Sequence, residues 1–258
     1  MSMQMRRSVL SRRRTLRLLD NLAASQVVST TMYFREGSDP AQLEKVIRLV
    51  SGLSSAPEGF AASVSNSHTG GAVFWGRDHG YLVIPPFPVT EDMVSSGADV
   101  AALHTLVDRE RLIGLIIIRL GEYAIGVFKG ETMLGSKVGT GLVHARHRQG
   151  GSSAHRFERH REKQMESFFT RVCAHAQEQL GPYLRSLDYL VYGGERYTTL
   201  SFRSQCQFLK SADDRVLPTL LDIRHPRQAA LESAIEKVLS STVIEWADDP
   251  VAAPPQPS

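Results

Sequence analysis

Apolar runs in the middle of the chain predict its clearest elements. Residues 112–119 and 123–128 form two strands joined by Leu120-Gly121-Glu122, a spacing typical of a β-hairpin. The first strand is apolar at nearly every position, so we expect it to be buried on both faces. A second hairpin is predicted from residues 72–75 and 81–84, and it ends at Pro85-Pro86.

Apolar side chains at three- and four-residue steps predict two well-marked helices. The first begins at Asp39-Pro40 and ends near Gly52, with a capping residue and proline at its start and a glycine at its end. The second covers residues 156–180 and ends at Gly181-Pro182. Its phenylalanines are expected in the core rather than as platforms for stacked bases, namely Phe157, Phe168 and Phe169.

Strands and helices alternate through the second half of the chain, with strands at 189–192 and 220–223 and helices at 201–209 and 229–239. This alternation predicts an α/β fold with a central mixed sheet flanked by helices. We expect one such domain over residues 30–245, after a basic N-terminal extension (1–29) and before a disordered proline-rich tail (246–258). Residues 129–154 show no periodicity and are predicted to form a long functional loop.

Composition narrows the class of protein. The chain has 258 residues, 42% of them hydrophobic, which suits a globular protein with a sizeable core. Its longest apolar run, residues 112–118, is far shorter than the ~20 residues that cross a bilayer. The two cysteines, Cys173 and Cys206, form no CxxC pair, so we expect neither a disulfide nor a cysteine zinc site. Cys173 is expected to be buried and inert, and a reducing, intracellular location follows.

The net charge of +3 hides two basic segments. Residues 137–163 hold seven Lys and Arg against only Glu158 and Glu162, and the first seventeen residues hold six Arg and no acid. Such focused charge favours a polyanionic partner, with a solvated helix face and a basic tail as the alternative. The N-terminal segment is also typical of a transit peptide, or of a basic helix that docks on RNA or on its own domain. These alternatives stay open.

The candidate chemistry lies in residues 144–161, HARHRQGGSSAHRFERHR. Gly150-Gly151 permits backbone conformations and close approaches that side chains forbid, and the surrounding guanidinium groups suit phosphates. Taken alone, a Gly-Gly pair is more typical of a hinge before a helix capped by Ser152 or Ser153. The four histidines in this window are interpreted as neighbours of phosphate rather than metal ligands, so no metal is predicted.

The pattern GGxSxxRFxRxR over residues 150–161, preceded by basic residues, resembles the catalytic loop of the eukaryotic and archaeal peptide-chain release factor. In that family a Gly-Gly-Gln loop enters the peptidyl transferase centre and promotes hydrolysis of peptidyl-tRNA. The resemblance covers about half of the chain and implies the ribonuclease H-like middle domain of the factor. Because no codon-reading domain is recognisable, the chain is more similar to the Vms-like release factors, which act on stalled ribosomes in ribosome-associated quality control.

The resemblance implies a cytoplasmic peptidyl-tRNA hydrolase that releases nascent peptides from stalled large subunits. Its partners would be the large ribosomal subunit, rRNA and peptidyl-tRNA, with no cofactor, no membrane and a monomeric state off the ribosome. The family's glutamine is matched by Ser152, and the nearest glutamine is Gln149, just before the glycines. An amide that donates and accepts hydrogen bonds suits the reaction, so Gln149 is the first catalytic candidate and Ser152 the second.

The predicted site residues fall into two groups. The predicted catalytic residues are Gln149, Gly150, Gly151 and Ser152, and the predicted RNA-binding residues are Arg146, Arg148, Ser153, Arg156, Arg159 and Arg161. The alternative hypothesis is a non-catalytic RNA- or ribosome-binding adaptor that has a degenerate release-factor fold.

Overall fold

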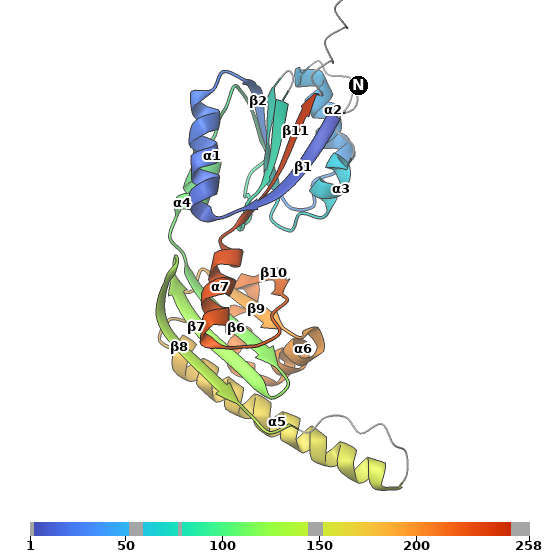
Figure 1. Cartoon of the computed structure of the whole chain (residues 1–258), viewed down its shortest axis with the longest axis vertical. Helices are drawn as coiled ribbons and strands as arrows, with labels where there is room; N and C mark the ends of the chain where they lie inside the picture. The colour runs from blue at the N-terminus through green and yellow to red at the C-terminus, as the bar shows by residue number, and fades with distance from the viewer. Residues whose placement is uncertain (1–2, 52–58, 77–78, 144–151, 249–258) are drawn as a thin grey trace, which may run out of the picture. The chain divides into compact units, whose positions relative to one another are not determined.

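The structure, a computed structural model, describes residues 3–51, 59–76, 79–143 and 152–248 (Figure 1). It divides the chain into two compact units. Unit 1 comprises Met1–Arg109 and Val238–Ser258, and unit 2 comprises Glu110–Lys237. Each unit has its own sheet, so the single domain predicted for residues 30–245 is wrong. Within the described ranges, no helix has the length and hydropathy that crossing a bilayer requires.

Unit 1 is built on a six-stranded antiparallel sheet of order β1-β11-β4-β3-β2-β5. Its strands are β1 (Met3–Leu10), β2 (Val28–Phe34), β3 (Gly71–Gly76), β4 (His79–Ile84), β5 (Met93–Ser96) and β11 (Ser241–Asp248). Helices cover both faces of the sheet (Figure 1), with α1 (Arg12–Ala24) and α4 (Ala101–Asp108) on one face and α2 (Pro40–Ser51) and α3 (Phe60–Ser65) on the other. The hairpin predicted for residues 72–84 and the helix after Asp39 are confirmed.

Both ends of the described chain belong to this sheet. β1 pairs with β11 along its whole length, from Met3 opposite Asp248 to Leu10 opposite Ser241. Leu19 of α1 is fully buried against the sheet. The prediction that residues 1–29 form an extension outside the domain is therefore wrong. These residues contain β1, α1 and the start of β2, which are all part of unit 1. The tail predicted from residue 246 is also wrong as far as Asp248, and residues 249–258 lie outside the described ranges.

Unit 2 contains the predicted mixed sheet, of order β10-β9-β6-β7-β8. Its strands are β6 (Leu112–Arg119), β7 (Glu122–Lys129), β8 (Thr132–Thr140), β9 (Tyr189–Gly194) and β10 (Val216–Leu221). β6, β9 and β10 run parallel, whereas β7 pairs antiparallel with β6 and β8 pairs antiparallel with β7. Numbered along unit 2, the strands lie in the order three-two-one-four-five, as expected for a ribonuclease H-like sheet. The predicted fold class is confirmed, and so is the hairpin at residues 112–128.

Helices cover both faces of the unit 2 sheet as well. One face carries α5 (Ser152–Leu180), α6 (Arg196–Gln205) and the short 3-10 helix η1 (Gln207–Arg215), and the other carries α7 (Gln228–Val238). A single helix was predicted at residues 201–209. The structure instead has α6, which begins at Arg196 and ends at Gln205, followed by η1 from Gln207. The side chains of Phe168, Phe202 and Leu209 share one core cluster on the first face.

Half of the loop predicted for residues 129–154 is regular structure. β8 occupies residues 132–140 and pairs with β7 from Thr132 opposite Lys129 to Thr140 opposite Glu122. α5 begins at Ser152, so the predicted loop is wrong at both ends. β8 is an edge strand that includes Gly135, Ser136 and Gly139, and most of its positions are half or fully exposed. It therefore lacks the apolar alternation by which a strand is recognised in sequence.

A substitution on β8 tests this packing. A Cβ at Gly139 would lie 2.3 Å from the Oη of Tyr123, whose ring is buried and stacks on His175 at 5.8 Å. We expect Gly139→Val to lower the free energy of unfolding by about 1–3 kcal/mol through overpacking. Urea unfolding of the full chain measures the loss.

Gly135→Val is the matched control on the same strand. A Cβ there meets only the Oε1 of Gln179, at 3.3 Å, which is the far end of a flexible side chain. Its effect on stability is expected to be small. Equal losses in the two variants would contradict the predicted clash with Tyr123.

Candidate functional site

The second half of α5 is fixed to the sheet of unit 2 by a buried apolar stripe. Phe168, Val172, Ala176 and Leu180 are fully buried, and Phe169 is 1% exposed. The rings of Phe168 and Tyr123 lie 6.1 Å apart, and those of Phe169 and Phe202 are equally close. Phe168 and Phe169 are thus confirmed as core residues, and the side chain of Phe157 lies outside the described part. Burial of this stripe anchors the helix.

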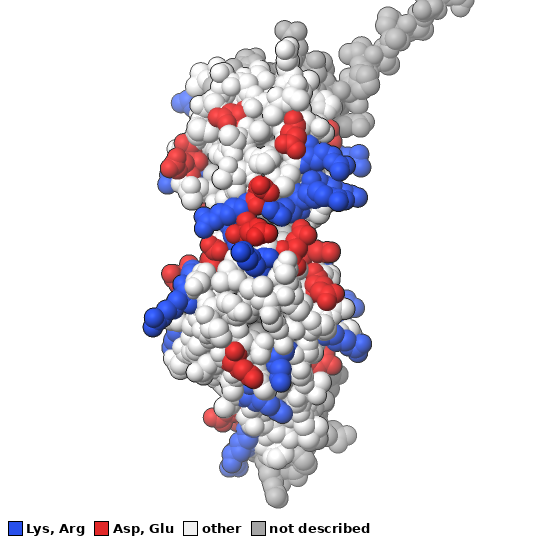
Figure 2. Space-filling view, turned by 90° about the vertical axis from the view of Figure 1, so that its left-hand side faces the viewer, with Lys and Arg blue, Asp and Glu red and all other residues white. Residues whose placement is uncertain are grey.

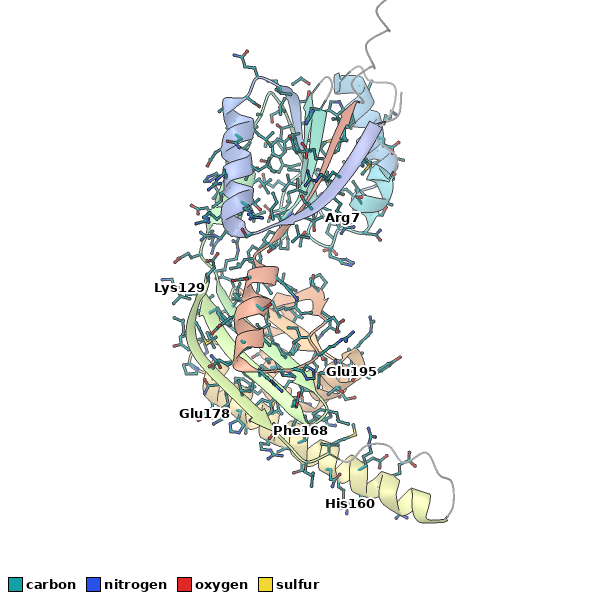
Figure 3. All side chains as sticks on the ribbon, viewed as in Figure 1. Arg7, Lys129, His160, Phe168, Glu178 and Glu195 are labelled. Carbon is teal, nitrogen blue, oxygen red and sulfur yellow. A yellow bond between two sulfur atoms is a disulfide. The ribbon has the colours of Figure 1, made fainter. Side chains whose placement is uncertain are left out.

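The first half of α5 extends past the sheet of unit 2. In Figure 1 the helix runs beyond the ends of β7 and β8, and Figure 3 shows His160 on this extension and Phe168 where the helix meets the sheet. The described side chains of the extension are mostly exposed, among them Glu158, Arg159 and Lys163. The segment predicted to act on RNA is therefore joined to a helix that projects from a rigid body.

The end of β8 is clamped where α5 meets the sheet. The Gly141 N–H donates to the carbonyl of Gly121 at 2.8 Å, and Gly121 has a φ of 90° that favours glycine. A Cβ at Gly141 would lie 2.6 Å from Cδ2 of Phe168, so only glycine lets the chain pass this close to α5. One end of segment 144–151 is thus held by backbone contacts, and the other continues into α5.

The predicted site residues are described to different extents. Those outside the described residues are Arg146, Arg148, Gln149, Gly150 and Gly151. Those with a described backbone but no described side chain are Ser152, Ser153 and Arg156, in the first turns of α5. The side chains of Arg159 and Arg161 are described. Of the predicted catalytic residues, the structure therefore describes only Ser152, at the start of α5, and the roles of all four remain predictions.

Arg161 differs from the other cations of α5. It is half-buried, on the helix face that continues through Met165 to Phe168, and its Nε is enclosed without a hydrogen-bond partner in the described part of the chain. A buried donor left without an acceptor costs about 1–3 kcal/mol. A phosphate oxygen or a backbone carbonyl would satisfy this donor.

Two buried tyrosines lie under α5 and α6. Burial raises the pKa of the Tyr123 phenol, although Arg171 opposes the shift. Burial also raises the pKa of Tyr192, whose ring lies 4.9 Å from the guanidinium carbon of Arg203. Both phenols therefore stay protonated near neutral pH, so neither provides a general base.

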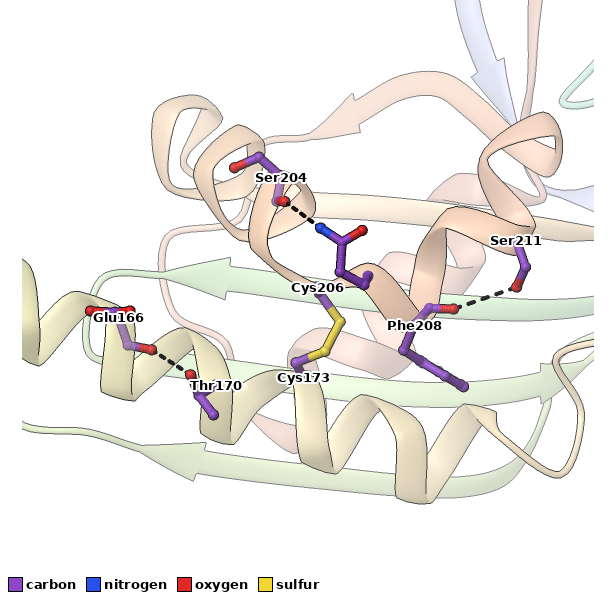
Figure 4. Close-up of a disulfide and its surroundings, with 8 residues drawn as sticks. Glu166, Thr170, Cys173, Ser204, Cys206, Phe208 and Ser211 are labelled. Atoms are coloured by element: carbon purple, nitrogen blue, oxygen red, sulfur yellow. Dashed lines mark hydrogen bonds between the residues drawn. A yellow bond between two sulfur atoms is a disulfide. The ribbon is translucent and has the colours of Figure 1, made fainter.

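The two cysteines form a disulfide that ties α5 to the end of α6 (Figure 4). Cys173 and Cys206 are bonded, with their Cα atoms 5.5 Å apart. The expectation of no disulfide is wrong, because the fold brings Cys173 of α5 next to Cys206, which lies 33 positions later between α6 and η1. The reducing location inferred from unpaired cysteines therefore loses its basis. Sequence reasoning missed this pair because the spacing of two cysteines carries no signal of which helices will pack together.

Comparison with known proteins identifies the family. A family model described as "Actinobacteria/chloroflexi VLRF1 release factor" matches residues 111–244, which is half of the chain. The chain belongs to the VLRF1 release factor family. The match spans unit 2 from Arg111 on and the first half of β11, and the residues before Arg111 lie outside it. The protein is therefore a member of a release-factor-like family of translation factors.

Archaeal release factors are similar to more than half of the chain. Peptide chain release factor subunit 1 of Archaeoglobus fulgidus is 29% identical over 152 residues, 59% of this chain and 37% of that protein. The protein of the same name from Pyrobaculum aerophilum is 30% identical over 143 residues, 53% of this chain and 35% of that protein. The chain thus spans little more than a third of the length of these relatives.

Two solved structures are similar to the chain at lower identity. An archaeal translation termination factor, aRF1, gives a TM-score of 0.40 at 19% identity, covering 89% of this chain and 70% of that one. Archaeoglobus fulgidus Pelota gives a TM-score of 0.31 at 9% identity, covering 91% and 63%.

The disulfide is open to direct measurement. We expect its removal by reductant or by Cys206→Ala to lower the free energy of unfolding by about 2–4 kcal/mol, because the crosslink constrains the unfolded chain. Thiol titration of denatured, unreduced protein should find no free thiol. In the Cys206→Ala variant, reductant should have no further effect on stability. Two reactive thiols in protein prepared without reductant would contradict the crosslink.

Proposed function

We propose that this protein is a ribosome-associated peptidyl-tRNA hydrolase of the cytoplasm that releases nascent peptides from stalled large ribosomal subunits. The observation that carries the proposal is the projecting first half of α5, which directly follows Gly150-Gly151. The part of α5 before Phe168 is about 24 Å long at 1.5 Å per residue. That length would let the glycines enter an RNA-lined cavity while the body of unit 2 stays outside.

The reaction requires little from the protein itself. Water attacks the carbonyl carbon of the peptidyl ester, the bond to the 3′ oxygen of the tRNA breaks, and that oxygen takes up a proton. Negative charge develops on the carbonyl oxygen, where preorganised donors stabilise it. The amide of Gln149 can donate to this oxygen or accept from the water. The N–H groups in the first turn of α5, beginning at Ser152, have no partners within the helix and are further donors.

Cationic side chains on both sides of the glycines would hold the surrounding RNA. Guanidinium groups bind phosphate oxygens in pairs, which suits the arginines before the glycines and those along α5. The proposed RNA-binding set is Arg146, Arg148, Ser153, Arg156, Arg159 and Arg161. The proposed partners are the large subunit, its rRNA and peptidyl-tRNA, and the proposed state off the ribosome is a monomer.

One observation favours a second candidate function. Ser152 stands where the release-factor pattern has its glutamine, and Gln149 lies on the other side of Gly150-Gly151. If neither residue takes over the glutamine's role, the protein would bind the ribosome as a non-catalytic adaptor. The two functions share the same fold and the same basic surface, so only a measurement of peptide release separates them.

Single-turnover release from purified large subunits loaded with peptidyl-tRNA tests the mechanism. We expect Gln149→Leu to leave folding and ribosome affinity intact and to slow release by about 10²–10³, the reduction typical of removing one preorganised donor. Gly151→Ala should slow release similarly, because a Cβ restricts the backbone next to the ester.

Ser152→Ala is the matched variant at the family's glutamine position. If Ser152→Ala abolishes release and Gln149→Leu does not, Ser152 replaces Gln149 in the proposed mechanism. If the wild-type protein binds large subunits and releases no peptide, the adaptor function stands instead.

Salt dependence tests the proposed binding of RNA. Reversing the charges of Arg146, Arg148 and Arg159 should weaken binding to large subunits. The logarithmic salt slope should become less negative by about 0.7–0.9 for each phosphate that the variant no longer binds. Lys129→Glu is the control, because Lys129 is exposed and Figure 3 shows it at the end of unit 2 opposite His160. An unchanged slope in the triple variant would mean that this surface is only solvated.

A further inference from the structure

We infer that the exposed arginines of α1, Arg13, Arg14 and Arg17, form a second RNA-binding surface, on unit 1, that contacts the sugar–phosphate backbone of rRNA. The inference rests on the proposed function, since the target is the RNA of the same large subunit. It concerns a different part of the chain, because β1 and α1 lie before residue 111, where the family match begins.

The structure gives these arginines a fixed position. Thr15, Leu19 and Leu22 are the buried residues of α1 and face the core of unit 1. Arg13 and Arg17 are exposed on the opposite side of the helix, and Arg14 is exposed on its flank. Arg6 and Arg7 are exposed on β1, which leads into α1 through Ser11, but as consecutive strand residues they face opposite sides of the sheet. The N-terminal arginines therefore belong to an ordered surface and not to a free tail.

Arg12, unlike the exposed arginines of α1, has a structural role within unit 1. Its Nε donates to the carbonyl of Val107 at 3.1 Å, and its Nη2 lies 2.9 Å from Oδ1 of Asp108. This pair fastens the start of α1 to the end of α4. Arg13, Arg14 and Arg17 lie on the far side of the helix from this contact, so fastening α1 to α4 does not account for them.

The charge of unit 1 is strongly polarised. Residues 6–17 hold six arginines, whereas the rest of the unit holds five Lys and Arg and thirteen Asp and Glu. Figure 2, which views the side of unit 1 that carries α1, shows Lys and Arg gathered in one band on this unit. A concentrated positive surface on an acidic body is the arrangement expected for a polyanionic partner.

The arginines are also unfavourable for the helix that carries them. The first turn of α1 has no acidic residue, although the positive end of the helix dipole favours acids and disfavours cations there. Arg13 and Arg17 are four residues apart and Arg14 and Arg17 are three apart, so like charges repel along the helix. Phosphate groups bound against this surface would remove both costs.

The residue type points to phosphate rather than to a general acidic partner. The exposed cations of α1 are all arginine, whose planar guanidinium pairs with two phosphate oxygens at once. Because the chain belongs to a release factor family, the phosphates at hand are those of rRNA. Contacts of this kind position a protein on RNA and carry no sequence preference.

The test uses the full chain in which Arg13, Arg14 and Arg17 are all changed to glutamine. Binding is measured to a fluorescein-labelled RNA duplex and to purified large subunits over a range of salt. We expect affinity for the duplex to fall at least about tenfold, and the salt slope to become less negative by about 2–3. The melting temperature should stay the same or rise, because the repulsion along α1 is removed. Lys45→Gln on α2, on the other face of the sheet, is the control and should change neither measurement.

Other outcomes overturn the inference and leave the proposed function separately testable. An unchanged affinity and slope in the triple variant would overturn it, even if peptide release is normal. So would binding to phosphatidylserine vesicles that the triple change abolishes while RNA binding persists. If the wild-type protein binds the duplex through these arginines and releases no peptide, the inference stands and the hydrolase proposal fails.

Discussion

The candidate site depends on the burial of one half of a single helix. Phe168 lies against Tyr123 and under the end of β8, so it fixes both the axis of α5 and the strand from which residues 144–151 depart. Without this anchor, the projecting half of α5 would have no defined direction relative to the sheet. Gly141 is part of the same arrangement, since a side chain there would force β8 away from Phe168.

The sequence predicts this anchor well and the neighbouring strand poorly, for one physical reason. Phe168, Phe169 and Leu180 recur at helical spacing because that face of α5 is buried, and continuous apolar residues mark β6 because it lies inside the sheet. β8 lies at the sheet edge, where no side chain has to be buried, so its positions can be glycine or serine. Its existence follows from pairing with β7 and not from its own pattern. The site motif at residues 150–161 indicates the family, but it does not decide between Gln149 and Ser152.

Unit 1 was predicted less well than unit 2, because its sheet depends on pairs of strands that are far apart in the sequence. β1 pairs with β11, so the strand closest to one end of the chain is completed by a strand near the other. Neither strand has a short-range partner that a sequence window would include. The arginines of α1 also hide its apolar positions Leu19 and Leu22, and an arginine-rich start is typical of a tail as well as of a helix. Recognising two units therefore requires knowing the long-range pairs.

Both units contain a helix that begins without the acidic residues that helix physics favours there. α1 and α5 each begin without an acidic residue in the first turn, although acids there typically stabilise a helix by about 0.3–1 kcal/mol. Each helix nevertheless forms, because its far half is buried: Leu19 and Leu22 hold α1, and Phe168 and Leu180 hold α5. Burial of the C-terminal half of each helix thus stabilises it enough to tolerate positive charge in its N-terminal half. The arginines in the first turns of α1 therefore cost the free protein a small electrostatic energy, which the proposed contact with RNA would lower.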